Sequence, residues 1–143
     1  MVPRPILLVE DNPQDEKLTL RALARVNLAN RVQVARDGQE ALDILLDPAR
    51  ELPAAVLLDL GLPKINGLEV LARLRAEART RLLPVAVLTS SDEERDRLRS
   101  YQNGANSFIL KPVDFTEFME AVSRIGAYWA LLNEPATPTP SKP

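Results

Sequence analysis

The sequence predicts a single α/β domain built on an open parallel β-sheet with helices on both faces. Four short apolar runs and one alternating segment lie along the chain, and such segments are typical of the buried and edge strands of a parallel sheet. Each run is followed by a segment with apolar residues at helical spacing. Because strands and helices alternate strictly and crossovers are right-handed, we expect a doubly wound (βα)5 arrangement.

The first two strand–helix units are expected within residues 6–46. The run at 6–9 is a buried strand, and a helix follows from Gln14 to Val26. Residues 31–36 alternate like a half-exposed edge strand, after which Asp37-Gly38 turns into a second helix. The residues expected on the buried faces of these two helices are Leu18, Ala22, Leu23, Val26, Ala41, Leu42, Leu45 and Leu46.

The third unit is expected to begin with an apolar strand that ends in a carboxylate at Asp59. Gly61 and Pro63 follow this strand, and turn residues lead into a third helix. The residues expected along the buried stripe of that helix are Leu68, Leu71, Leu74 and Ala78.

The last two units are expected in residues 84–132. A strand at 84–89 is followed by a mostly charged, weakly anchored helix that ends near Gly104. A strand at 106–110 precedes the last helix, whose stripe is Phe118, Val122, Ile125 and Trp129. The domain is therefore expected to span residues 4–132, with a disordered proline-rich tail at 133–143.

Composition excludes several classes of chemistry. The 143 residues are 45% hydrophobic and contain neither histidine nor cysteine, which removes Ser-His-Asp, Cys-His and HExxH sites and disulfides. A net charge of −2 does not favour nucleic acid as a partner. The four apolar residues before Glu10 are too few for a signal sequence or a membrane span, so a cytoplasmic protein is expected.

Polar residues end the predicted strands, at the edge where parallel sheets bind ligands: Glu10, Asp11, Asp59, Thr89 and Lys111. Singly, each has a structural interpretation, such as a turn cap, a hydroxyl at a strand end or a surface lysine. Three clustered carboxylates, however, repel one another unless a hard cation lies between them, and an all-oxygen site suits Mg²⁺. Beside such an ion, Lys111 and Thr89 would stabilise a phosphoryl group that Asp59 attacks as a nucleophile.

Four motifs resemble the receiver domain of two-component response regulators, over almost all of residues 4–130. In chain order they are LLVEDN at 7–12, LLDLGLPKING at 57–67, PVAVLTSS at 84–91 and FILKP at 108–112. Each motif alone is weak, but their order and spacing together are highly specific. The resemblance implies the flavodoxin-like strand order 2-1-3-4-5.

The resemblance also implies a role for each site residue. Asp59 would be the phosphoacceptor, and Glu10, Asp11 and the Gly61 carbonyl would hold Mg²⁺ with it. Lys111 would contact the phosphoryl group, and a cis peptide would join it to Pro112. Thr89 and Phe108 would be the switch pair. Two positions depart from the usual pattern: Asn66 stands where many receivers have aspartate, and Gly61 is unusually small.

The partners implied are a sensor histidine kinase and a second copy of the chain. The sequence looks most like single-domain regulators paired with phytochrome kinases, so a bacteriophytochrome kinase is the expected donor. No effector or DNA-binding domain is expected, and signalling would run through protein contacts. A homodimer is expected through the fourth helix, the fifth strand and the fifth helix, where Phe115, Tyr128 and Trp129 are surplus apolar bulk.

Several rival functions remain as alternatives. A metal-dependent phosphatase with an aspartyl nucleophile would share the acids and Lys111, but it needs a second acid two residues after the nucleophile, where Gly61 stands. A flavodoxin-like cofactor binder needs a Ser/Thr/Gly phosphate loop after the first strand, and a dinucleotide site needs GxG, which is absent. A scaffold leaves the polar cluster unexplained. The chain is thus expected to be a regulatory phosphoacceptor and not an enzyme.

Overall fold

The computed structural model describes residues 4–25, 32–89, 104–105, 107–110 and 116 of the chain. The elements in these ranges alternate as the sequence predicts. They are β1 (Ile6–Val9), α1 (Pro13–Arg25), β2 (Val32–Ala35), α2 (Gly38–Leu45), β3 (Ala55–Asp59), α3 (Gly67–Ala76), β4 (Val85–Thr89) and β5 (Ser107–Leu110). The predicted fourth helix, the predicted fifth helix apart from residue 116, and the tail at 133–143 lie outside the described residues.

The five strands form one parallel sheet in the order β2-β1-β3-β4-β5, which confirms the predicted strand order. Because β1 lies between β2 and β3, the chain reverses its direction of winding after β2, and the carboxyl ends of β1 and β3 meet at the switch point. The register pairs Val9 with Leu58, so Glu10 follows β1 at the level of Asp59. The topology therefore brings together carboxylates that are far apart in the sequence.

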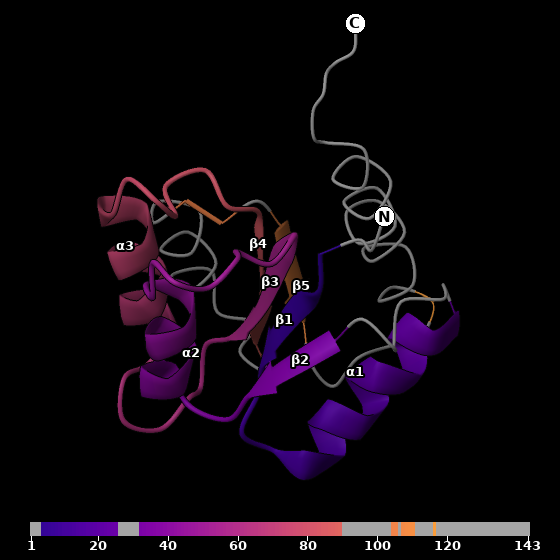
Figure 1. Cartoon of the computed structure of the whole chain (residues 1–143). Coiled ribbons are helices and arrows are strands. Elements are labelled where there is room, and N and C mark those ends of the chain that lie inside the picture. The colour runs from indigo at the N-terminus through magenta and orange to yellow at the C-terminus, as the bar shows by residue number, and fades with distance from the viewer. Residues whose placement is uncertain (1–3, 26–31, 90–103, 106, 111–115, 117–143) are drawn as a thin grey trace, which may run out of the picture.

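Helices cover both faces of the sheet, with α2 and α3 on one face and α1 on the other (Figure 1). The larger core lies under α2 and α3, and the strand residues that contribute to it are Leu7, Val9, Val56, Leu58, Val85 and Val87. The alternate strand residues, including Leu8 and Leu57, are equally buried on the opposite face. Burial on both faces explains why β1, β3 and β4 are continuous apolar runs, whereas the edge strand β2 alternates.

Two predicted core residues are in fact exposed. Leu18 leaves 45% of its surface in solvent, because the buried stripe of α1 is centred on Thr19 and includes Ala22 and Leu23. At 100° per residue, Leu18 lies at the edge of that stripe. Ala78 is exposed as well, since α3 ends at Ala76 and the chain turns away in an extended conformation.

Two arginines near the end of α3 connect it to neighbouring segments. The Arg75 guanidinium donates to the Gly104 carbonyl from Nε at 3.0 Å and from Nη2 at 2.7 Å, and its Nη1 donates to the Thr80 carbonyl at 3.1 Å. Burial lowers the pKa of Arg75. Arg79 Nε donates to the Leu45 carbonyl at the end of α2, at 3.2 Å.

Among the described residues, no helix is long and apolar enough to cross a membrane.

Candidate functional site

Three carboxylates meet at the carboxyl ends of β1 and β3. One ligand oxygen from each of Glu10, Asp11 and Asp59 lies within 4.8 Å of the others. Glu10 is fully buried and Asp59 is 5% exposed, whereas Asp11 faces solvent. The Glu10 backbone N–H donates to the Ala35 carbonyl at 2.9 Å, so the sheet hydrogen bonding continues through the residue that presents this carboxylate. The predicted cluster of acids is therefore present.

Local hydrogen bonds orient two of these carboxylates. Oδ1 of Asp59 accepts from the Gly61 backbone N–H at 3.3 Å, and Oε2 of Glu10 accepts from the Asn12 backbone N–H at 3.2 Å. The Asn12 side chain in turn accepts from the backbone N–H groups of Gln14 and Asp15, which begin α1. Glu10 is thus connected through Asn12 to the start of α1, and Asp59 is held by the loop that follows β3.

The donor set fits a hard divalent cation. All three groups offer carboxylate oxygen, and two of them are removed from water, so their mutual repulsion is poorly screened. An ion bound to oxygen at about 2.0–2.6 Å can draw such ligands together, with water completing its shell. The arrangement suits Mg²⁺ or a similar ion, as the sequence predicts.

The segment between β3 and α3 closes tightly over the end of β3. Gly67 donates its N–H to the Leu60 carbonyl at 3.1 Å, and a Cβ at Gly67 would lie 2.4 Å from the Asp59 carbonyl oxygen. Only glycine therefore permits this closure. Asn66 is the N-cap of α3, and its side chain accepts from the Glu69 backbone N–H at 2.9 Å. Asn66 thus has a structural role that the sequence comparison left undefined.

Gly61 leaves open space beside the candidate phosphoacceptor. It is exposed, and the nearest atom to a Cβ built at this position is Oδ2 of Asp59, at 4.0 Å. That distance is an ordinary van der Waals contact. Because Gly61 has no side chain, it does not cover the side of the Asp59 carboxylate that faces it.

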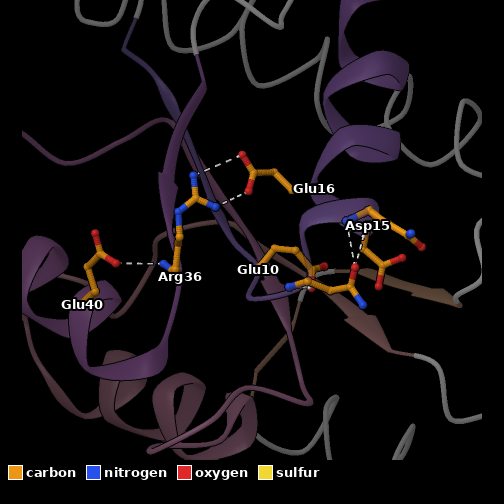
Figure 2. Close-up of polar contacts among 7 residues, drawn as sticks. Glu10, Asp15, Glu16, Arg36 and Glu40 are labelled. Carbon is orange, nitrogen blue, oxygen red and sulfur yellow. Dashed lines mark hydrogen bonds and ion pairs between the residues drawn. The ribbon is translucent and has the colours of Figure 1, made fainter.

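A charged network that the sequence analysis missed holds the rim next to this site. The Arg36 guanidinium pairs with both carboxylate oxygens of Glu16 on α1, and the Arg36 backbone N–H donates to Glu40 Oε1 at 2.9 Å (Figure 2). The hydrogen bond with Glu16 is the main cause that raises the pKa of Arg36. The sequence pattern places Arg36 only at the end of an edge strand, because nothing local in the sequence indicates a contact with α1.

The remaining predicted site residues are described only in part. Thr89 ends β4 one residue beyond Leu88, which pairs with Asp59, so its backbone is at the correct edge of the sheet. Phe108 lies in β5 and pairs with Val87. The side chains of Thr89 and Phe108 lie outside the described part of the structure, as do the residues Lys111, Pro112, Phe115, Tyr128 and Trp129.

Comparisons with known proteins agree with the geometry. The family model of the response regulator receiver domain matches residues 6–123. A probable methanogenesis regulatory protein, FilR2 of Methanothrix harundinacea, is 43% identical over 127 residues, which cover 87% of this chain and 82% of FilR2. The solved structure of the bacteriophytochrome response regulator AtBRR is 53% identical with a TM-score of 0.76, covering 94% of this chain and all of AtBRR.

Two further solved structures bear on the chemistry of the site. One is the phosphorylated cyanobacterial phytochrome response regulator RcpA, 34% identical with a TM-score of 0.77. The other is the Mn²⁺-bound form of response regulator Rcp1, 31% identical with a TM-score of 0.77. Each covers 98% of this chain and is itself covered completely. The fold thus occurs in relatives that carry a phosphoryl group and in relatives that carry a divalent metal ion.

Proposed function

Because the chain belongs to the response regulator receiver domain family, we propose that Asp59 accepts a phosphoryl group in a Mg²⁺-dependent reaction. The observation that carries the proposal is the nearly buried Asp59 carboxylate at a strand end, with Glu10 and Asp11 beside it. The phosphorylated structure of RcpA and the Mn²⁺-bound structure of Rcp1 support the same chemistry.

The transfer needs a nucleophile, a leaving group and compensation for charge. One oxygen of the Asp59 carboxylate forms a bond to phosphorus while the bond between phosphorus and a donor nitrogen breaks, and the electron pair leaves with that nitrogen. Glu10, Asp11, Asp59 and the Gly61 carbonyl would hold Mg²⁺, which when bound neutralises charge on the phosphoryl oxygens. Lys111 and Thr89 are the proposed further contacts of these oxygens.

We propose that the donor is the phosphohistidine of a sensor kinase, and that this kinase is of the phytochrome type. Its support is the similarity to the bacteriophytochrome response regulator AtBRR and the cyanobacterial phytochrome response regulator RcpA. A panel of phosphorylated histidine kinases with and without phytochrome domains tests the assignment by comparing transfer rates. Equal rates from unrelated kinases would contradict the phytochrome pairing without touching Asp59.

The described residues do not favour the alternative of a metal-dependent phosphatase, although it would share the cluster of acids. Such an enzyme needs an acid two residues after the nucleophile, and that position is Gly61, whose N–H donates to Asp59. The chain is proposed to act as a regulatory phosphoacceptor whose only chemistry is its own phosphorylation and dephosphorylation. The predicted homodimer and the switch pair remain part of this proposal.

The test is labelling with a small phosphodonor, such as acetyl phosphate, in the presence and absence of Mg²⁺. Intact mass and phosphate-affinity electrophoresis should show one acid-stable, base-labile phosphoryl group on the wild type with Mg²⁺ and none on Asp59→Asn. Asp47→Asn is the matched control, since Asp47 lies in the segment after α2, at the other end of β3. Labelling of Asp59→Asn at the wild-type rate would overturn the assignment.

A further inference from the structure

The segment that carries Gly61 contains a residue in an unusual backbone conformation. Lys64 has a φ of 66°, and among the described residues it is the one non-glycine residue with a positive φ. Lysine has no local side-chain interaction that favours the left-handed region, unlike asparagine or aspartate. Contacts outside the segment must therefore compensate for this conformation.

Those contacts are with the start of α2. Nζ of Lys64 lies 3.3 Å from Oδ2 of Asp37, the N-cap residue of that helix. The other carboxylate oxygen, Oδ1, accepts from the Glu40 backbone N–H at 2.8 Å. One carboxylate therefore begins α2 and also holds the ammonium group of a residue from the β3–α3 segment.

The backbone of Ile65, the residue after Lys64, also lies very close to the start of α2. A Cβ built at Gly38 would lie 2.2 Å from the Ile65 carbonyl oxygen, a distance that no real side chain allows. Glycine at the first position of α2 thus lets the β3–α3 segment lie directly on the helix. Leu62 is buried within the same segment, and Ile65 packs against the core.

The β3–α3 segment is anchored at two places close to Gly61. Toward α3 it is held by the Gly67 hydrogen bond to Leu60, and in its middle by the contact of Lys64 and Ile65 with α2. Gly61 lies inside the loop that the Leu60–Gly67 hydrogen bond closes, three residues before Lys64. The position of its carbonyl group therefore depends on where the anchors hold the chain.

We propose that Lys64 is a positioning residue for the divalent-cation site: its ion pair with Asp37 holds the β3–α3 segment against α2 so that the Gly61 carbonyl faces the carboxylates. The inference rests on the proposed function, since it assigns a role toward the ion that Asp59 needs. An exposed ion pair with no such role would affect stability slightly and metal binding not at all.

The first measurement needs no metal. In Lys64→Ala, whose Cβ retains the backbone cost of the left-handed conformation, hydrogen exchange at the Gly67 amide should rise by about two- to fivefold. The Val56 amide, which donates to the Pro84 carbonyl at the opposite end of β3, should not change. A change at both amides would indicate global destabilisation and would overturn a local role.

The second measurement is the affinity for Mg²⁺ by calorimetry, with Mn²⁺ as a paramagnetic probe. Lys64→Ala and Asp37→Asn should each weaken binding by about two- to fivefold, and the double variant should be no weaker than either. Lys64→Arg should restore the wild-type affinity, because it keeps the positive charge. Asp37→Asn keeps a side chain that caps a helix well, so α2 remains intact.

Arg50→Ala is the matched control, because it removes the exposed ion pair of Arg50 with Asp47, before β3 and away from the cluster. Its Mg²⁺ affinity should equal that of the wild type. Unchanged affinity and unchanged Gly67 exchange in Lys64→Ala would overturn the positioning role, while Mg²⁺-dependent labelling of Asp59 would still stand. Absence of that labelling in the wild type would instead overturn the proposed function.

Discussion

Replacing Gly61 by leucine is expected to slow the loss of the phosphoryl group from Asp59 about tenfold, which corresponds to about 1.4 kcal/mol in the activation free energy. A Cβ at this position would lie 4.0 Å from Oδ2 of Asp59, so the remaining leucine atoms have room to extend beside an attached phosphoryl group. Hydrolysis requires water to approach phosphorus on the side opposite the leaving oxygen, and bulk there restricts the approach. Gly61→Ala adds one carbon only and should change the rate about twofold or less.

The substitution should be tolerated by the fold. Nothing within 4 Å other than the Asp59 oxygen opposes a Cβ, and Gly61 does not have a positive φ. Loss of glycine also reduces the entropy of the unfolded chain, which adds about 0.4–1 kcal/mol to stability at compatible sites. A slower rate is therefore not expected to arise from unfolding.

The assay is the decay of phosphorylated protein after removal of acetyl phosphate, followed by phosphate-affinity electrophoresis at saturating Mg²⁺. The Mg²⁺ affinity of each variant is measured in parallel, because a larger side chain could displace the Gly61 carbonyl from the ion. If leucine leaves the half-life unchanged while Mg²⁺ affinity is also unchanged, steric control at this position is refuted.

Three further predictions concern stability and assembly. Arg75→Met should lower the free energy of unfolding by about 2 kcal/mol, or the melting temperature by about 8 °C, because backbone carbonyls lose a charged donor; a shift below 2 °C would contradict this. The hydrogen bond from the Glu40 backbone N–H lowers the pKa of Asp37 from its ordinary value of 3.8. The positive charge of Lys64 lowers this pKa as well. The contribution of Asp37 to stability is therefore complete above the ordinary value and lost as the pH falls through the lower folded pKa. The difference in urea midpoint between wild type and Asp37→Asn should stay constant from about pH 7 to 5 and vanish in acid, and a difference that already shrinks by pH 5 would refute this. Trp129→Ala should shift a wild-type dimer toward monomer in sedimentation, and a wild type that is monomeric with and without an acyl-phosphate mimic would remove the dimer.

The sequence alone determined the architecture and the chemistry of the central site. Continuous apolar runs identify strands buried on both faces, and the rule that parallel strands end at one edge brings Glu10, Asp11 and Asp59 together before any coordinates are known. These inferences succeed because hydrophobic periodicity and strand-end position are local properties of the chain. The described strands and the cluster of acids follow from them, whereas the strand order was implied by the resemblance to receiver domains.

Only the tertiary structure decided the details that depend on distant contacts. The buried stripe of α1 is centred on Thr19, a polar residue that a hydrophobic pattern does not count, and Leu18 is left exposed. The ion pair of Lys64 with Asp37 joins two residues that are remote in sequence. They are brought together by the sheet order, in which β1 lies between β2 and β3. Nothing in the local sequence around either residue indicates this contact. The physical reason is that a side chain's partner depends on the relative placement of whole elements, whereas a strand or helix depends mainly on its own neighbours.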